Sequence, residues 1–306
     1  MLISIVCPFY NEESTVSSFL ARLEPVLEAT GERFEIVCVN DGSTDHTMAR
    51  LLSEKETRPT IRIVELSRNF GKEAALTAGL DAAKGDVVIP IDADLQDPPE
   101  LIPRFLERWR DGYEVVLGRR ADRSTDGALK RITAQLYYRV HNAISDLEIP
   151  RNVGDFRLMD RCVVDALRSL PEHRRFMKGL FAWVGFRTAT VEYDRGPRVA
   201  GASKFGGWRL WNFALEGITA FSTVPLRIWL YLGFFVSLLA FGYAAFIVAR
   251  TLIFGVDLPG YASLLTVVLM FGGLQMMGLG ILGEYLGRIH IETKQRPVYI
   301  IRRVHD

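Results

Sequence analysis

The chain has 306 residues, which is enough for one large domain or two smaller ones. Its formal net charge is +1, so the overall charge points to no nucleic-acid partner, and we expect none. Its three cysteines give no disulfide framework; Cys7 and Cys38 lie in apolar runs, where we expect buried, reduced thiols.

The first 120 residues alternate between two patterns. Short β-branched runs occur at LISIVCP, FEIVCVN, IRIVEL, DVVIPID and YEVVLG. Segments with helical spacing lie between them, near residues 12–29, 44–56, 72–84 and 98–110. This alternation predicts an α/β fold, with a mostly parallel sheet covered by helices on both faces. Ligands of such sheets bind beyond the carboxyl ends of the strands.

Polar residues gather at four predicted strand exits, which are residues 8–13, 40–45, 67–72 and 92–96. At the last exit, Asp92 and Asp94 are separated by one residue, so in an extended strand both side chains point to the same side. Hard oxygen ligands suit Mg²⁺ or Mn²⁺, whose coordination is usually completed by substrate phosphates and water. The alternative is a pair of solvated carboxylates at a strand end.

The other exits offer groups for a nucleotide. Asp41 could accept hydrogen bonds from a ribose or a base, or it could be a simple turn residue. Arg68 and Lys72 lie near a predicted helix N-terminus, where a diphosphate would be stabilised. The alternative for both is an ordinary surface charge.

The segment DPPE, residues 97–100, predicts a helix start. Asp97 is a favourable N-cap, Pro98 suits the first helical position, and Glu100 could close a capping box. We therefore assign Asp97 and Glu100 to the helix and Asp92 and Asp94 to the ligand.

The segments after residue 120 change in character. A basic and then helical stretch precedes a further α+β stretch at residues 151–195, and we expect the catalytic unit to end near residue 205. The glycines of AGASKFGGW indicate either a mobile loop over the site or a plain linker. Residues 206–224 are aromatic-rich and predict a helix in the membrane interface, the alternative being an ordinary packed amphipathic helix.

Two long apolar runs follow. No charged residue occurs from Ile228 to Ala249 or from Leu258 to Gly283, and each run could cross a bilayer core of roughly 30 Å. We therefore predict a transmembrane hairpin over residues 225–287 and a tail over residues 288–306; two buried helices are the alternative. GLGILG, residues 278–283, lies inside the second run, so it indicates close helix packing rather than a dinucleotide site.

Charge and the N-terminal sequence set the expected orientation. The tail is rich in Lys and Arg, which places it in the cytosol by the positive-inside rule. The start MLISIVCPFYNEE has no basic segment and only a short apolar run, so we expect no signal peptide and a cytosolic N-terminal unit.

Several motifs together resemble a known family. PFYNEE, NDGSTD, RNFGK and DADLQDPPE are similar to the inverting family-2 glycosyltransferases of the GT-A fold. Within that family the chain resembles the polyprenyl-phosphate glycosyltransferases, which include dolichol-phosphate mannose synthases and phage-type bactoprenol glucosyltransferases of O-antigen modification. This likeness covers nearly the whole chain and rests on DRSTDGALKR, NVGDFRLMD, FMKGLFAWVG, ALEGITAFSTVPLRIW and LGEYLGRIHIETKQRP.

The resemblance implies a role for each matching position. The uridine would be contacted by Pro8, Tyr10, Glu12 and Asp41. Asp92 and Asp94 would hold the nucleotide and the metal, with Asp94 as the more direct ligand, and Gln96 would lie beside the sugar or the lipid phosphate. Asp155 matches the catalytic base. The lipid phosphate would be bound by Arg119, Arg131 and Lys204, with Arg120 and Arg123 as competing candidates.

The implied reaction moves glucose from UDP-glucose to undecaprenyl phosphate, with Mg²⁺ or Mn²⁺ and with inversion to a β-linked product. GDP-mannose, UDP-GlcNAc and UDP-galactose are alternative donors. The implied location is the inner membrane, with several spans and with the catalytic unit and the C-terminus in the cytosol. Glycines of the second span, such as Gly283 and Gly287, would permit a homo-oligomer.

Chemistry qualifies the role of Asp155. A phosphate monoester is mostly dianionic at neutral pH, since its second pKa is about 6, so it needs little deprotonation. Asp155 would then orient a phosphate-binding Arg or take the last proton from the monoanion; a plain ion pair with Arg157 or another basic residue is the alternative.

Other functions fit the sequence less well. A flippase component would need a polar path, but the two runs carry no charge. A processive synthase would carry the motif Q-x-x-R-W, which the chain lacks. A catalytically dead binding module would not be expected to keep Asp92, Asp94 and Asp155.

Overall fold

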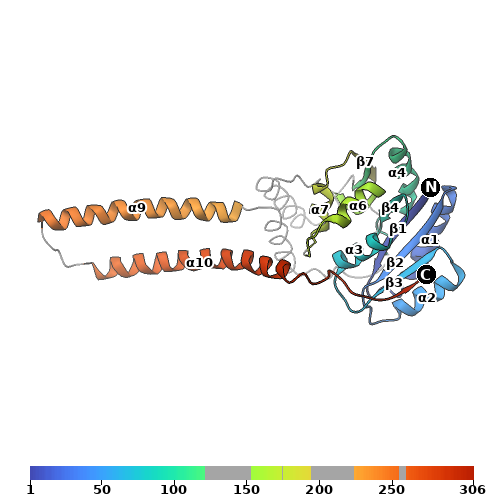
Figure 1. Ribbon diagram of the computed structural model, residues 1–306, viewed down its shortest axis with the longest axis horizontal. Helices are drawn as coiled ribbons and strands as arrows, with labels where there is room; N and C mark the ends of the chain where they lie inside the picture. The colour runs from blue at the N-terminus through green and yellow to red at the C-terminus, as the bar shows by residue number, and fades with distance from the viewer. Residues whose placement is uncertain (121–152, 174, 194–223, 255–259) are drawn as a thin grey trace.

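The computed structural model describes residues 1–120, 153–173, 175–193, 224–254 and 260–306 (Figure 1). The described residues form one eight-stranded sheet in the order β7-β5-β6-β4-β1-β2-β3-β8, and a long helical hairpin projects from this unit (Figure 1). Both chain termini lie at the sheet unit rather than at the tip of the hairpin (Figure 1).

The first half of the sheet unit follows the predicted alternation. Its elements are β1 (Leu2–Phe9), α1 (Val16–Ala29), β2 (Arg33–Asn40), α2 (Thr47–Thr57), β3 (Ile61–Leu66), α3 (Lys72–Ala82), β4 (Val87–Pro90), the 3₁₀ turn η1 (Pro99–Leu101) and α4 (Ile102–Arg110). β1 pairs in parallel with β2 and with β4, and β2 pairs in parallel with β3. The carboxyl ends of these four strands therefore meet at one edge of the sheet.

The second half adds β5 (Val115–Arg120), β6 (Val153–Asp160), α6 (Arg161–Ser169), α7 (Met177–Trp183) and β7 (Thr188–Tyr193). β6 lies between β4 and β5 and is antiparallel to both, whereas β5 and β7 are parallel. Because β6 runs in the opposite direction, its first residues lie at the edge where β4 ends. This reversed strand brings the segment around Asp155 to the predicted site.

Helices cover both faces of the sheet, as predicted. Phe19 of α1, Leu51 of α2 and Phe105 of α4 belong to the apolar core on one face. Residues of α3, α6 and α7, including Leu76, Val164 and Leu180, form the core on the other face. Cys7 and Cys38 are buried free thiols, as expected, and burial raises the pKa of Cys38 to about 12.

Helix α3 packs unusually close to the sheet. A Cβ atom placed on Gly79 would lie 2.2 Å from Cγ1 of Val6 and 3.1 Å from Cγ2 of Val39. Gly79 therefore lets α3 approach β1 and β2 at a distance that no larger residue permits. This contact fixes the distance of α3 from the sheet, and the first turn of α3 carries Lys72 and Glu73.

The projecting hairpin consists of α9 (Val224–Phe254) and α10 (Tyr261–Thr293). The two helices touch where Trp229 packs on Gly278, which confirms close packing at the first glycine of GLGILG. Many large apolar side chains along both helices are exposed, among them Phe234, Phe241 and Leu264. Restricted to the residues that the structure describes, no helix combines the length and the apolarity that a membrane span requires, so the two predicted spans stay a prediction.

The chain returns to the sheet after the hairpin. Helix α10 continues past residue 287 to Thr293, and β8 (Ile301–His305) then pairs antiparallel with β3. Tyr299 donates a hydrogen bond to Asp81 at 2.7 Å, and the backbone N–H of His173 donates to Glu292 at 3.1 Å. The last residues of the predicted tail thus form the eighth strand of the sheet, which the sequence did not lead us to expect.

Some predictions fall outside the described residues. These are the interfacial helix at residues 206–224, the glycine-rich loop before it, and the basic positions Arg123, Arg131 and Lys204.

Candidate functional site

The exits of β1 and β2 are tied together by side chains of the second exit. The backbone N–H of Asn11 donates to Oγ of Ser43 at 3.1 Å, and that of Glu12 donates to Oγ1 of Thr47 at 2.9 Å. Pro8 lies at the end of β1, and Tyr10 is exposed just beyond it. The predicted uridine contacts Pro8, Tyr10 and Glu12 therefore line one fixed rim of the carboxyl edge.

Asp41 connects two strand exits. It is buried after β2, and its carboxylate accepts hydrogen bonds from the backbone N–H groups of Phe70 at 2.8 Å and Gly71 at 3.0 Å. Burial raises the pKa of Asp41, although these two donors and nearby Arg68 counteract the shift. Asp41 thus fixes the loop that leads into α3, and a carboxylate keeps further acceptor positions for a ligand.

Asp92, Asp94 and Gln96 lie in the segment after β4. These three side chains are partly exposed, while the residues between them are buried. The backbone N–H of Gln96 donates to Asp94 at 3.1 Å, and Oε1 of Gln96 is buried without a partner among the described residues. β4 ends at Pro90 and a turn follows, so the extended strand expected at the two aspartates is absent, and their common orientation stays a prediction.

A lysine links two of the predicted site carboxylates. The ammonium of Lys72 lies 2.8 Å from Asp92 and 2.7 Å from Asp155. Asp92 follows β4 and Asp155 lies in β6, so Lys72 joins the two strands across the edge of the sheet. The structure thereby brings together a predicted metal ligand and the predicted catalytic base.

Asp155 is held in its charged form. Burial by itself raises the pKa of this carboxyl, but the positive charges of Lys72, Lys178 and Arg157 outweigh it and hold the pKa well below its usual range. Oδ2 of Asp155 pairs with Lys72, while Oδ1 is buried and has no hydrogen-bond partner among the described residues. The buried oxygen therefore keeps an acceptor position that no described residue uses.

The two aspartates suit a divalent cation whose coordination is completed by the phosphates of a bound nucleotide. Among the described residues, no group of three or more His, Cys, Asp or Glu side chains could hold a metal ion. Asp92 and Asp94 would supply two hard oxygen ligands, and phosphate oxygens and water would complete the coordination. Such a site suits Mg²⁺ or Mn²⁺ and would be weak without the nucleotide.

The prediction of a capping box at residues 97–100 is wrong. The turn η1 begins at Pro99 with Pro98 at its N-cap and has no side-chain cap hydrogen bond. Asp97 is instead buried, where it accepts a hydrogen bond from Tyr193 of β7 and lies 3.8 Å from Arg120 of β5. Glu100 pairs with Arg22 of α1 at 2.8 Å. Long-range partners have replaced the local ones that the sequence favours.

Arg119 and Arg120 leave β5 on opposite sides. Arg119 pairs with Glu192 on β7, and both side chains are about half exposed. Arg120 is largely buried beside Asp97 and lies against Gly154, where an added Cβ would be 3.3 Å from its Nη2. The predicted lipid-phosphate ligand Arg119 therefore already has a carboxylate partner, whereas Arg120 lies against Gly154, the residue before Asp155.

Sequence reasoning missed part of the charged cluster. Lys72 was expected only as a neighbour of a diphosphate, and neither Glu73 nor Lys178 was assigned a role. Glu73 follows Lys72 in α3 and accepts a hydrogen bond from the backbone N–H of Met177 at 3.2 Å. Burial, followed by the charge of Asp155, raises the pKa of Glu73 to about 7. Adjacent opposite charges at the start of a helix, Lys72 and Glu73, were the only hint of this cluster that we find in the sequence, because their partners lie in distant segments.

A family model and full-length relatives both indicate a glycosyltransferase. Residues 4–168 match the family described as Glycosyl transferase family 2. The chain is 52% identical over 305 residues to the SfII prophage-derived bactoprenol glucosyl transferase of Shigella flexneri, covering 100% of this chain and 99% of that one. It is also 52% identical to a prophage bactoprenol glucosyl transferase homolog of Escherichia coli K12, covering 99% of both chains.

A solved structure shows the same fold. Glucosyl-3-phosphoglycerate synthase from Mycobacterium tuberculosis superposes with a TM-score of 0.51 at 22% identity, covering 71% of this chain and 76% of that one. The expected GT-A architecture of the sheet unit is thereby confirmed. From the matched segment and from relatives that span the whole chain, we conclude that this protein is a glycosyltransferase and belongs to glycosyl transferase family 2.

Proposed function

We propose that the protein transfers glucose from UDP-glucose to undecaprenyl phosphate and forms a β-linked polyprenyl-phosphate sugar. The observation that carries the proposal is the cluster of Asp92, Lys72 and Asp155 at the carboxyl edge of the sheet. It occurs in a chain that is 52% identical over its full length to a protein named bactoprenol glucosyl transferase. Glucosyl-3-phosphoglycerate synthase, which has a related fold, was crystallised with Mn²⁺ and uridine diphosphate. This supports a uridine-diphosphate sugar as the donor here.

The donor occupies the side of the site formed by β1, β2 and β4. Pro8, Tyr10, Glu12 and Asp41 would contact the uridine, and Arg68 and the start of α3 would face the diphosphate. A divalent cation held by Asp92 and Asp94 would act as a Lewis acid on the leaving group. Gln96, whose Oε1 has no partner in the described part of the chain, would receive a hydrogen bond from the sugar.

The transfer is a direct displacement. An oxygen of the acceptor phosphate forms a bond to C1 of the sugar while the bond from C1 to the diphosphate breaks and UDP leaves. This path inverts an α-linked donor to a β-linked product. A dianionic acceptor needs no base, and Asp155, whose pKa is low, is a poor one. Asp155 instead keeps Lys72 in place, and its Oδ1, which has no partner among the described residues, would accept a hydrogen bond from an acceptor that binds as the monoanion.

The hairpin α9–α10 serves as the membrane anchor in this proposal. Its large apolar side chains are exposed along both helices, and water would be an unfavourable environment for such a surface. Two charge-free runs in its sequence support a location in the inner membrane, with the sheet unit in the cytosol. A polyprenyl chain stays in the bilayer, so an anchored enzyme meets its acceptor at the surface.

The test is an assay of sugar transfer with purified protein. Undecaprenyl phosphate, Mg²⁺ or Mn²⁺, and radiolabelled UDP-glucose, UDP-galactose, UDP-GlcNAc or GDP-mannose would be incubated together, and label in the lipid phase would be counted. We expect transfer from UDP-glucose, its loss with EDTA, and its loss in the folded variant Asp94→Ala. Absence of lipid-linked label with every donor would refute the proposed function, and label from another donor only would correct the sugar.

A further inference from the structure

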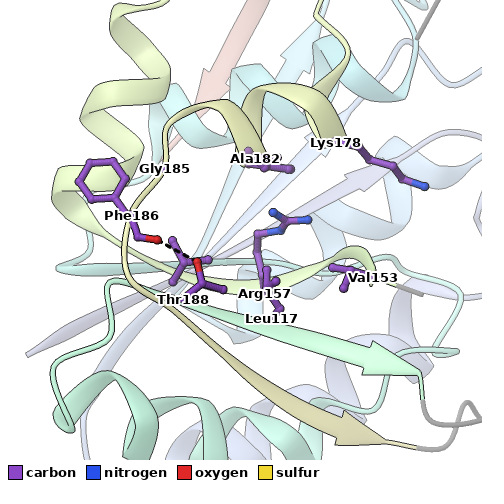
Figure 2. Close-up of a pocket in the computed structure, with 10 residues that line it drawn as sticks. Leu117, Val153, Arg157, Lys178, Ala182, Gly185, Phe186 and Thr188 are labelled. Carbon is purple, nitrogen blue, oxygen red and sulfur yellow. Dashed lines mark hydrogen bonds between the residues drawn. The ribbon is translucent and has the colours of Figure 1, made fainter. Parts of the chain in front are cut away.

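A cavity adjoins Asp155 on the face of the sheet that α7 covers. It has a volume of about 240 Å³ and lies between α7 and the strands β5 and β6. Val153 and Arg157, which flank Asp155 at two-residue spacing on β6, both line it. Figure 2 shows Lys178 and Val153 at one end, Gly185 and Phe186 at the other, and Arg157 between them. The end with Lys178 is the end nearest the site.

Arg157 projects a buried charge into this cavity. It is only 5% exposed, and its guanidinium lies 3.9 Å from the centre of the Phe181 ring. Nη2 donates to the carbonyl of Gly154 at 2.8 Å and Nε to that of Asp155 at 3.4 Å. Among the described residues, nothing accepts a hydrogen bond from Nη1. Arg157 thus holds the backbone beside Asp155 and keeps one donor free.

Lys178 is the second cation of the cavity. It lies in the first turn of α7, is partly buried, and has no hydrogen-bond or ion-pair partner within the described ranges. The other walls are mostly apolar, including Leu117, Phe181 and Ala182. A partly buried ammonium among apolar walls is costly unless an anion accompanies it, and the low local dielectric strengthens its attraction for one.

Asp155 and Glu73 lie close enough for the charge of Lys178 to lower the pKa of both, but neither forms a hydrogen bond or ion pair with it among the described residues. The carboxylate of Asp155 uses Oδ2 for Lys72, and its buried Oδ1 has no partner in the described part of the chain. A group that fits between Oδ1 and the two cations must donate one hydrogen bond and accept several. A singly protonated phosphate does both, because its hydroxyl can donate to Asp155 while its charged oxygens accept from Lys178 and Arg157.

We propose that Lys178, supported by Arg157, binds the phosphate group of a phosphomonoester acceptor at this end of the cavity. The inference rests on the proposed function and divides its site in two. Lys72 serves the donor side, where it pairs with Asp92, and Lys178 serves the acceptor side. The segment before α7 contacts the end of α10 through His173 and Glu292, so this part of the site adjoins the helical hairpin. Asp155 pairs with Lys72 and lies near Lys178, so in this proposal it lies where the two substrates meet.

The test compares Lys178→Met and Lys178→Arg with the wild type. Initial rates would be measured against undecaprenyl phosphate and against the nucleotide sugar. We expect Lys178→Met to raise the KM for undecaprenyl phosphate roughly tenfold or more, because a charge-assisted hydrogen bond is lost, while the KM for the donor stays within about twofold. Lys178→Arg should recover part of the loss. An unchanged acceptor KM, or an equal rise in both KM values, would overturn the proposal.

Controls separate this outcome from others. Lys84→Met removes an exposed lysine just beyond α3 and should leave both KM values unchanged. The melting temperature of Lys178→Met must match that of the wild type. If it does not, the KM values of Lys178→Arg, which keeps the charge, are compared with the wild type instead. A wild type that transfers sugar to no polyprenyl phosphate would refute the proposed function itself, which is a different result.

A second arm identifies the source of the phosphate. Binding of inorganic phosphate and of citronellyl phosphate, a water-soluble prenyl phosphate, would be measured by calorimetry on the full chain. The proposal expects citronellyl phosphate to bind the wild type, to compete with undecaprenyl phosphate, and to bind Lys178→Met more weakly. Binding of inorganic phosphate alone, lost in Lys178→Met without any effect on transfer, would show a site for free phosphate and overturn the acceptor role.

Discussion

Lys72 is the residue that joins the separate parts of the site. Its ammonium is shared by Asp92 and Asp155, whose negative charges would otherwise repel each other across the strand edge. The two carboxylates in turn raise the pKa of Lys72 well above its usual value, although burial acts in the opposite direction. The lysine is therefore charged at every physiological pH.

Replacing Lys72 by methionine should keep the stem of the side chain and remove the charge. Without this counter-ion Asp155 loses its position, and we expect kcat to fall about a hundredfold, as for other preorganised charges. Steady-state kinetics on Lys72→Met and on the exposed control Lys84→Met would measure the difference. A kcat within fivefold of the wild type in Lys72→Met would show that the bridge has no catalytic consequence.

Glu73 makes the folding stability depend on pH with the opposite sign to that of most carboxylates. Its pKa is about 7 in the folded protein against 4.5 for the free group, so the folded state binds the extra proton between these values. Stability from this residue is therefore full below about pH 4.5 and is lost as the pH rises to about 7. Asp155, with its lowered pKa, contributes stability that is lost only at more acid pH.

The variant Glu73→Gln should remove this slope. We expect the unfolding free energy of the variant, relative to the wild type, to rise between about pH 4.5 and pH 7. Denaturant unfolding at several pH values would measure it, with the exposed Glu56→Gln as a control that leaves the slope unchanged. Parallel curves for Glu73→Gln and the wild type would contradict the assignment.

Among the elements, α3 is the one whose packing controls the site. Its close approach to the sheet depends on Gly79, and its first turn carries both Lys72 and Glu73. Helix propensity alone favours alanine over glycine by about 1 kcal/mol. The 2.2 Å contact of an added Cβ with Val6 predicts the opposite result.

Gly79→Ala should lower the unfolding free energy by about 1–3 kcal/mol through overpacking. It should also reduce activity, because α3 would shift away from β1. Urea-induced unfolding would measure the change, and the double variant Val6→Ala with Gly79→Ala should recover part of the stability by removing the clashing methyl group. A more stable single variant would show that α3 is less tightly constrained.

The elements of the first half were predictable because their signals are local. Apolar periodicity over a few residues located four parallel strands and the helices between them, and the strand exits followed from that pattern. β8 was missed because its short basic sequence gains its stability from β3, more than two hundred residues away. Asp97 was misassigned for the same reason, since its partners Tyr193 and Arg120 are distant in sequence.

At the scale of the whole molecule, β8 closes an edge of the sheet. Val304 lies opposite Val64, and Arg302 pairs with Glu65 at 3.3 Å. Without β8 the backbone of β3 would be an open edge, which is a template for aggregation.

Deleting residues 301–306 should lower the melting temperature by several degrees and cause aggregation that increases with protein concentration. Scanning fluorimetry and light scattering in detergent would detect both effects. Arg303→Ala, which keeps the strand, should behave like the wild type. A deletion variant that stays monodisperse at high concentration would show that β3 needs no cover.

The strands that come before and after the hairpin in the sequence lie at the two edges of the sheet. The chain leaves the sheet from β7, at one edge, and returns as β8, at the other. The hairpin is therefore an insertion in the sequence of a single sheet, and the strands before and after it lie at opposite edges. Because β8 follows the hairpin in the chain, the sheet cannot be completed until the whole hairpin has been synthesised.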